Sequence, residues 1–261
     1  MIEPILEMRD VVKSYGENSV LKGVSFQVRR GETKIIIGGS GSGKSTLLKL
    51  AMGLEKPDEG QILIESEDIT KMRERDLARV RMKIGMVFQE SALFDSMTVR
   101  DNVAYQLHEK GTHAEEVESR VRQNLGFVGL EDAIEKFPAE LSGGMKRRVA
   151  IARALAGEPN IMFYDEPTAG LDPIGAAGFD QLIHELRDAL GLTVFLITHD
   201  LDTLYAICDR VAVLADKKVV AVGTIEELLA LDHEWIQEYF KGPRGRAASH
   251  VKHEPTTGVD A

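Results

Sequence analysis

The glycine-rich stretch GGSGSGKST, residues 38–46, constrains the fold of this chain more than any other feature. It matches the pattern G-x-x-x-x-G-K-[ST], and it lies between the apolar run TKIII and a segment from about Lys44 to Met52 that reads as a helix. Glycines in such a loop let successive backbone N–H groups point inward at the α- and β-phosphates of a nucleotide. The sequence therefore predicts an α/β protein built around a phosphate-binding loop.

The side chains that close this loop have separate predicted roles. Lys44 adds a positive charge near the β- and γ-phosphate oxygens, Ser45 presents its hydroxyl to Mg²⁺, and Thr46 reaches the α-phosphate. The rest of the cradle is formed by Gly38, Gly39, Ser40, Gly41, Ser42 and Gly43. A nucleotide such as ATP, together with Mg²⁺, is therefore the expected ligand.

Two acids follow a second apolar run, in the stretch IMFYDE at residues 161–166. A phosphate loop needs a carboxylate to hold the Mg²⁺ shell, and we expect Asp165 to bind the magnesium-associated water. Glu166 places a second carboxylate toward the γ-phosphate, where it can polarise an attacking water. The pair predicts hydrolysis of the nucleotide as well as binding.

A second glycine pair lies about a hundred residues after the phosphate loop, in LSGGM at residues 141–145. Ser142 is a good helix N-cap, Gly143 and Gly144 allow close approach of a ligand to the backbone, and the following basic, apolar-rich run has helical spacing. The positive end of such a helix favours an anion. The chain therefore carries two stretches suited to phosphate, and the second needs its own explanation.

The order of apolar and polar residues predicts an α/β core that is interrupted by helices. Strands are expected over residues 5–37, 61–65, 84–88, 160–164 and 193–197, with a closing hairpin over 210–215 and 218–223. Residues 91–156 have helical spacing and few strand candidates. Thr224 and Glu227 form a capping box for a short helix. An amphipathic helix is expected with one apolar face made by Phe179, Leu182, Ile183, Leu186 and Leu190.

Composition narrows the class of protein. The 261 residues carry a formal net charge of −10, which argues against binding nucleic acid by neutralising its phosphates. Cys208 is the single cysteine, so an internal disulfide is excluded, and its apolar neighbours predict a buried, inert thiol. The longest apolar runs are far shorter than the roughly 20 residues of a membrane-spanning helix. We expect the chain to be soluble by itself and to meet a membrane only through a partner.

Three stretches together, GGSGSGKS, LSGGM and IMFYDEP, resemble the ATP-binding subunit of an ABC transporter in order and spacing. The resemblance covers residues 4–240. It implies a P-loop NTPase core with an antiparallel β subdomain and an inserted helical subdomain at about 91–156. It also implies a homodimer in which two copies pair head to tail. Ser142, Gly143 and Gly144 would then contact the γ-phosphate of the ATP held by the partner's phosphate loop.

The same resemblance implies roles for four further residues. Tyr15 corresponds to the aromatic residue that stacks on adenine. Gln89 corresponds to the glutamine that touches Mg²⁺ and the attacking water while it links the core to the helical insert. Asp172 corresponds to the acid of the loop that crosses the dimer interface, and His199 to the switch histidine that contacts the γ-phosphate.

Within this family, Met145 and the stretch FQESALFDSMTVRDNVAY at residues 88–105 look most like the ATPases of Mla and MCE-associated lipid transporters. That likeness implies ATP-driven phospholipid transport between the inner and outer membranes. The implied partners are an Mla-type permease, an MCE-domain lipid-binding protein and a small cytoplasmic accessory subunit. The chain would lie on the cytoplasmic face of the inner membrane, with residues 241–261 as a tail that is mobile or contacts the partner protomer.

Three alternatives stay open. The first is the ATPase of another importer, such as one for amino acids, since those ATPases share much of this core. The second is a non-transport ABC protein of DNA repair or translation, although the long insertions, zinc modules or fused second ATPase of that class are not seen. The third is a domain that binds nucleotide without turnover, against which Glu166 argues.

Overall fold

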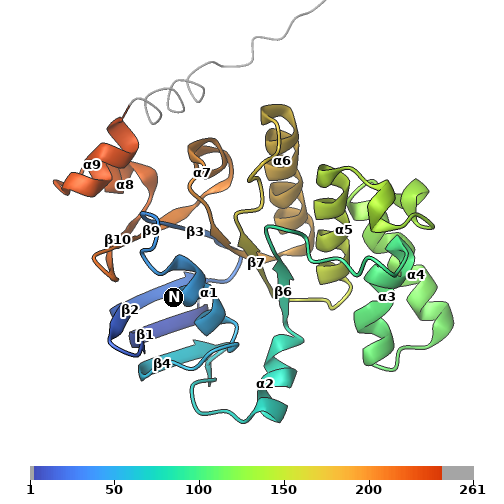
Figure 1. The fold of residues 1–261 in the computed structure, drawn as a ribbon, viewed down its shortest axis with the longest axis horizontal. Coiled ribbons are helices and arrows are strands. Elements are labelled where there is room, and N and C mark those ends of the chain that lie inside the picture. The colour runs from blue at the N-terminus through green and yellow to red at the C-terminus, as the bar shows by residue number, and fades with distance from the viewer. Residues whose placement is uncertain (1–2, 243–261) are drawn as a thin grey trace, which may run out of the picture.

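Two β-sheets form the framework of the protein in the computed structural model, which describes residues 3–242 (Figure 1). The smaller sheet is antiparallel. Its 4 strands run in the order β2-β1-β4-β5: β1 (Pro4–Tyr15), β2 (Asn18–Arg29), β4 (Glu59–Ile64) and β5 (Glu67–Asp68).

The larger sheet carries the loops that matter for function. Its 6 strands run in the order β10-β9-β3-β8-β7-β6: β3 (Thr33–Ile37), β6 (Ile84–Val87), β7 (Ile161–Asp165), β8 (Thr193–Ile197), β9 (Arg210–Ala215) and β10 (Lys218–Gly223). All neighbouring pairs are parallel except β10 and β9, which form the antiparallel hairpin expected from the sequence. Strands β3 and β8 are buried along their whole length, which explains why they read as continuous apolar runs.

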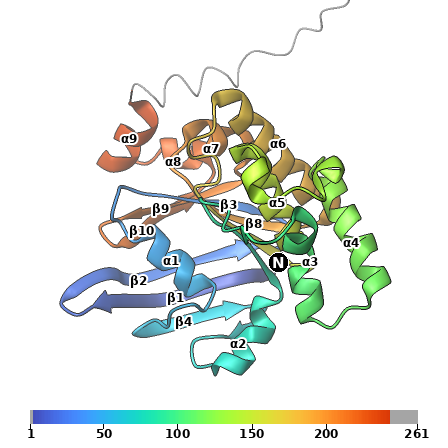
Figure 2. The same ribbon diagram turned by 45° about the vertical axis from the view of Figure 1, so that its right-hand side comes forward.

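Successive side chains of a strand point to opposite faces of a sheet, so the core forms two clusters, one on each face of the larger sheet. Ile36 and Phe195 pack with α1 (Lys44–Ala51) and the smaller sheet. Ile35 and Leu196, one residue away on the same strands, pack with the helices on the other face. Figure 2 shows the larger sheet between these two layers.

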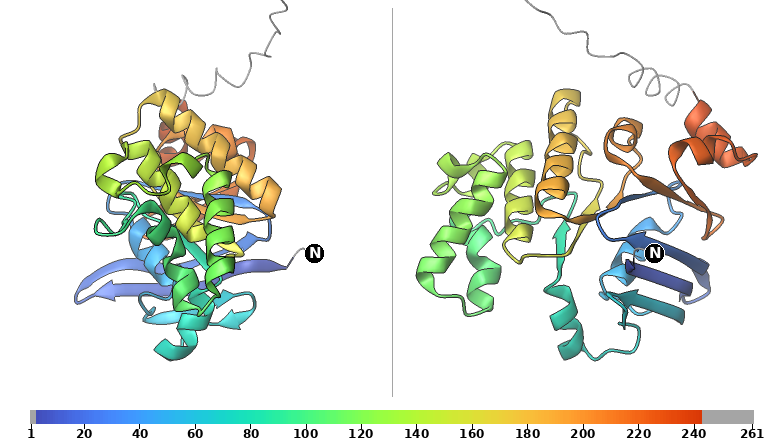
Figure 3. Two further views of the ribbon diagram at one scale, coloured as in Figure 1. Left: turned by 90° about the vertical axis from the view of Figure 1, so that its right-hand side faces the viewer. Right: turned by 180° about the vertical axis from the view of Figure 1, so that it is seen from behind.

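The remaining helices cover the second face of the larger sheet, except the first of them, whose Leu77 and Val80 pack with α1 and the smaller sheet. They are α2 (Glu74–Arg81), α3 (Val99–Glu109), α4 (Ala114–Phe127), α5 (Gly143–Leu155), α6 (Pro173–Leu190), α7 (Leu201–Ile207), α8 (Ile225–Leu229) and α9 (Glu234–Lys241), with short 3₁₀ turns at Glu131–Ala133 and Pro138–Glu140. Seen from behind, α3 and α4 lie at the side of the molecule away from β1 and β2 (Figure 3).

Helix ends follow the capping signals in the sequence. The capping box of Thr224 and Glu227 is present, and Ser142 accepts a hydrogen bond from the N–H of Met145 at 3.3 Å. Gly191 ends α6 in a left-handed conformation, at φ 64°. One expectation was wrong: Leu190 is 38% exposed, because the helix ends at this residue before its side chain can reach the core.

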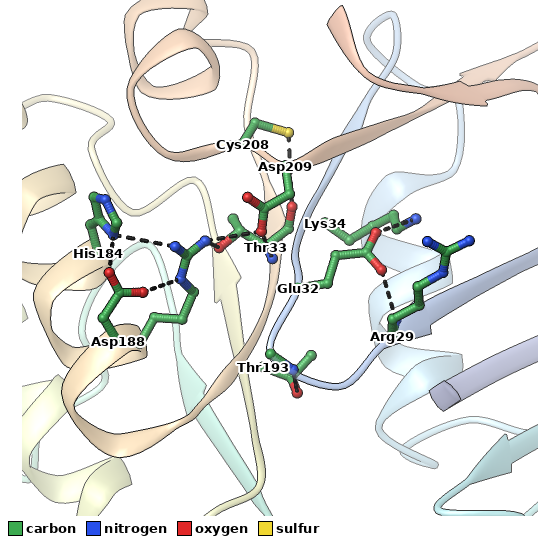
Figure 4. Close-up of polar contacts among 11 residues, drawn as sticks. Arg29, Glu32, Thr33, Lys34, His184, Asp188, Thr193, Cys208 and Asp209 are labelled. Atoms are coloured by element: carbon green, nitrogen blue, oxygen red, sulfur yellow. Dashed lines mark hydrogen bonds and ion pairs between the residues drawn. The ribbon is translucent and has the colours of Figure 1, made fainter. Parts of the chain in front are cut away.

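A polar network holds the amino-terminal end of β3 (Figure 4). Asp209 accepts hydrogen bonds from the Thr33 N–H at 2.7 Å and from Arg187 at 2.9 Å. Beside it, Lys34 and Glu32 form a buried ion pair at 2.6 Å, and burial lowers the pKa of Lys34. Cys208, expected as a buried thiol, is half-buried here and packs against the core, and burial raises its pKa to about 12. This network fixes the end of the sheet opposite the glycine-rich loop.

Two findings bear on the ends of the chain and on membranes. Most of the segment expected to be a tail, residues 243–261, lies outside the described residues. Across residues 3–242, none of the helices combines the length and the apolar content that a membrane span requires.

Candidate nucleotide-binding site

Four loops that were predicted from the sequence to bind nucleotide lie at one edge of the larger sheet, because the parallel strands before them all end there. Parallel strands end at the same edge, and β7 pairs with both of its neighbours there: Tyr164 with Val87, and Asp165 with Ile197. Gln89, Glu166 and His199 therefore each follow a strand end at this edge. Strand β3 pairs with β8 at the same level, so the loop 38–46 begins beside them.

The phosphate-binding loop has the conformation that glycine alone adopts without strain. Gly41 and Gly43 have φ angles of 73° and 105°, in the region that disfavours other residues. A Cβ on Gly38 would lie 2.3 Å from the carbonyl oxygen of Leu214, so the backbone could not approach β9 with any side chain at that position. The Ser42 hydroxyl is buried without a hydrogen-bond partner among the described residues. The loop thus presents backbone and hydroxyl groups that an anion can satisfy.

Lys44 lies inside this cradle. Its ammonium group donates hydrogen bonds to the carbonyl oxygens of Gly38 at 2.8 Å and Gly39 at 3.0 Å, so it curls back over the loop. Burial lowers the pKa of Lys44, and the carboxylates of Glu166 and Asp165 oppose that effect. The structure therefore places this cation close to both predicted acids.

Glu166 and His199 come together directly. The His199 Nδ1 lies 2.8 Å from the Glu166 Oε2, and the His199 backbone N–H donates to the same oxygen at 3.4 Å. Glu166 has a positive φ of 46°, an uncommon conformation for a residue with a side chain. Its backbone N–H donates to Ile197 at 2.9 Å, which holds the turn against β8. The acid and the histidine thus form one unit at the strand ends.

The predicted Mg²⁺ residues supply suitable donor atoms. Ser45 offers a hydroxyl, Asp165 a carboxylate and Gln89 an amide oxygen, which are the hard oxygen ligands that Mg²⁺ prefers. The pKa of Asp165 is raised by burial and by Glu166, and lowered again by Lys44. A nearby cation would favour the ionised form of Asp165. The residue set fits a metal that keeps several waters and is shared with substrate phosphates.

Tyr15 lies at the end of β1, where the predicted adenine contact needs an open aromatic face. Tyr15 is 45% exposed, and its hydroxyl is held by the Glu55 carboxylate, which raises the pKa of Tyr15. The Lys13 ammonium lies 5.4 Å from the ring centroid. The ring is thus fixed at its hydroxyl end and accessible to solvent, an arrangement that permits stacking.

The second glycine pair belongs to a different surface. Ser142, Gly143 and Gly144 line a groove of about 560 Å³ together with Asp172, which caps α6 by accepting from Ile174 and Gly175. The buried Arg147 joins the two walls through a hydrogen bond to the Ala169 carbonyl. No residue of 38–46 lines this groove, and no hydrogen bond within residues 3–242 links Ser142 to the phosphate loop.

Two aromatic residues beside the nucleotide edge were not predicted from the sequence. Tyr239 of α9 donates a hydrogen bond to the His199 carbonyl at 3.3 Å and stacks on Trp235, with ring centroids 4.9 Å apart. The Trp235 indole nitrogen would lie 3.9 Å from a Cβ on Gly39. Their four-residue spacing places both rings on one helix face. The spacing of these two residues in the sequence could have predicted a shared aromatic face on the helix. It could not have predicted which loops that face contacts.

Comparison with known proteins identifies the class. The family pattern described as ABC transporter matches residues 21–169. Methionine import ATP-binding protein MetN 1 of Listeria monocytogenes serotype 4b is 43% identical over 228 residues, covering 86% of this chain and 68% of that protein. MetN of Brucella abortus is 45% identical over 227 residues, covering 87% and 62%. This chain therefore spans about two thirds of the length of these relatives.

Solved structures agree. The structure of cbiO1 from Clostridium perfringens, part of the ABC transporter complex cbiONQ, superimposes on this chain with a TM-score of 0.82 at 33% identity. The match covers 96% of this chain and 99% of that one. An ATP-binding cassette solved as a dimer in a post-hydrolysis state with ADP and Pi gives 0.76 at 35% identity, covering 84% and 98%. The chain belongs to the ABC transporter family, as an ATP-binding subunit, and the expected fold class is confirmed.

The family defines the activity at its general level. The protein is an ABC-type ATPase, with ATP and Mg²⁺ as ligands and hydrolysis coupled to transport. The expectation of phospholipid transport and of an MCE partner finds no support in the relatives named above, which are methionine importers. The amino-acid alternative is better supported.

Proposed function

We propose that this protein is the ATPase subunit of an importer for a small polar molecule of the amino-acid class. It works as a homodimer at the cytoplasmic face of a membrane permease. The observation that carries the proposal is the 43–45% identity to methionine import ATPases along a stretch of about 228 residues. In this account residues 4–240 act as one nucleotide-binding domain, and the helical segment at about 91–156 passes motion to the permease.

Within each copy, we propose that the phosphate loop and Lys44 hold the phosphates of ATP while Ser45, Gln89 and Asp165 hold Mg²⁺. Glu166 takes the proton of the attacking water, and His199 contacts the γ-phosphate. The 2.8 Å contact between these two side chains supports their joint action, because one can orient the other. Tyr15 stacks on adenine with its exposed ring.

Across the dimer, we propose that Ser142, Gly143 and Gly144 of one copy close over the ATP bound by the other, with Asp172 at the interface. Two observations support this. No residue of the phosphate loop of the same copy lines their groove. A Cβ added to Gly143 would have no neighbouring atom within 4 Å, so the space in front of this residue is open. The N-terminus of α5 then faces an anion brought by the partner.

A mixing experiment tests this composite site. Ser142→Arg places a bulky cation in the groove, and we expect it to reduce ATP turnover of the homodimer to the level of Lys44→Ala. Mixing the two variants should restore part of the activity, because one of the two sites in a mixed dimer has both an intact Lys44 and an intact Ser142. The measurement is steady-state phosphate release against mixing ratio. Full activity of Ser142→Arg alone would contradict the composite site.

A transport assay tests the proposed substrate class. The protein would be used to capture its permease from membranes of the source cell, and the complex placed in proteoliposomes. We expect ATP-dependent uptake of radiolabelled methionine or another amino acid, lost with Glu166→Gln. Uptake of no amino acid, with ATP-dependent movement of labelled phospholipid instead, would overturn the importer proposal.

Phospholipid transport stays as the second candidate because of Met145 and the stretch 88–105. Met145 is half-buried and packs against the core of the helical layer, so its side chain fits a packing role in α5. The phospholipid arm of the same proteoliposome assay decides between the two substrates.

A further inference from the structure

A cavity of about 610 Å³ lies between α6 and α7, apart from the residues assigned to ATP. Figure 1 shows these two helices side by side above the larger sheet. Most of the wall is apolar: Leu171, Pro173, Ala176, Ala177, Ala206 and Ile207. The volume lies within the range of sites that hold small organic molecules.

One buried carboxylate in this wall lacks a full set of partners. Asp180 is 4% exposed, and its Oδ2 accepts a hydrogen bond from Thr203 at 2.9 Å. Its Oδ1 has no hydrogen-bond partner among the described residues. A buried carboxylate without a full set of donors costs free energy, and a cation held in the adjoining cavity would offset part of that cost.

The charges around the cavity favour a cation. Asp200, the N-cap of α7, and Asp202 within that helix also line it, and no lysine or arginine does so within the described part of the chain. The Nδ1 of His184 of α6 lies 3.3 Å from the Asp188 carboxylate (Figure 4). Burial, with a smaller contribution from Asp200 and Asp202, raises the pKa of Asp180 to about 7.

The geometry argues against a metal ion. Residues 3–242 contain no group of three or more acidic, histidine or cysteine side chains placed to hold one. The carboxylates are spread around an apolar space, which suits a molecule that is charged at one end and apolar at the other. We propose that this cavity binds a small organic ammonium ion, with its charged group toward the carboxylates of Asp180, Asp200 and Asp202 and its apolar body against the α6 and α7 walls.

A ligand at this position would contact the back of both catalytic loops. Thr168 and Leu171 belong to the loop after Glu166, and Asp200 directly follows His199. Thr168 bridges them, since its hydroxyl lies 3.4 Å from Asp200 and 3.3 Å from Thr203, the donor to Asp180. Occupation of the cavity would therefore act on the loops that position Glu166 and His199.

Benzylamine titration tests the proposal, with benzyl alcohol as the neutral ligand of the same shape. By isothermal titration calorimetry at pH 8, we expect the wild-type protein to bind the amine and to bind the alcohol at least about 10-fold more weakly, the difference that a charged hydrogen bond makes. Asp180→Asn should weaken amine binding by a similar factor, while the exposed Asp132→Asn should not. Binding to wild type should fall between pH 8 and pH 6, because Asp180, whose pKa is raised to about 7, becomes protonated over this range and loses its charge. Equal binding of amine and alcohol, or unchanged binding by Asp180→Asn, would overturn the proposal.

Asp180→Asn keeps an oxygen that can accept from Thr203, so its fold should be retained, and thermal melting checks this. A second variant, Ala176→Phe, fills the cavity without changing any charge. We expect it to abolish benzylamine binding. Unchanged affinity in Ala176→Phe would place the amine elsewhere and contradict the assignment even if Asp180→Asn failed to fold.

Discussion

Replacing Glu166 by glutamine is expected to lower ATP turnover by about 100- to 10,000-fold, the usual contribution of a general base. Glutamine has the size of glutamate but cannot take a proton from water. The amide can still meet the His199 Nδ1 across the present 2.8 Å contact, so the loop should keep its shape. ATP binding should therefore remain, and the ATP-bound state should last longer. The measurement is steady-state phosphate release together with equilibrium ATP affinity.

Glu109→Gln is the matched control for this substitution. Glu109 is exposed at the end of α3. It belongs to none of the loops that carry the predicted ATP-binding residues, so the loss of its charge should leave turnover unchanged. Unchanged turnover in Glu166→Gln would refute the assignment of the base. An equal loss in both variants would point to a general charge effect instead of a proton transfer.

The second large effect is expected for Lys44→Ala, which should weaken ATP binding itself by about 10- to 150-fold, equivalent to the loss of one charged hydrogen bond. Lys44 is the cation of the phosphate loop, and alanine cannot replace its contact with phosphate oxygens. The variant also frees the carbonyl oxygens of Gly38 and Gly39, which Lys44 now satisfies. Any stabilising effect of those bonds on the empty loop is small beside the lost phosphate contact.

Trp235 provides the readout for this experiment. It is the single tryptophan of the chain, and its indole lies beside Gly39 in the phosphate loop. We expect ATP to change its fluorescence in the wild type and in the exposed control Lys71→Ala, at similar concentrations. In Lys44→Ala the change should require much more ATP. A wild-type affinity in Lys44→Ala would contradict the loop assignment.

Local sequence was enough to predict the phosphate loop and the two acids. Each depends on a short strand followed directly by its functional residues, so the fold of a few neighbouring residues decides their placement. The meeting of Glu166 with His199 also follows, because both come after adjacent parallel strands. For the same reason the strands of the larger sheet were predicted close to their observed bounds.

Contacts between distant segments could not be predicted in this way. Tyr239 and Trp235 reach His199 and Gly39 only because α9 packs back over the strand ends, which no local pattern encodes. Asp180 was outside the apolar face expected for α6, and it is buried because α7 covers a second face of that helix. Burial of a polar side chain by a neighbouring helix depends on tertiary packing alone.

The most direct test of the account is the mass of the Glu166→Gln protein in solution, measured by light scattering with and without ATP and Mg²⁺. We expect one chain without nucleotide and two chains with it, because each ATP needs Ser142, Gly143 and Gly144 of a second copy. Adding Ser142→Arg to the same protein should return it to one chain at the same ATP concentration. A single-chain mass with saturating ATP, or a dimer that survives Ser142→Arg unchanged, would contradict the composite site.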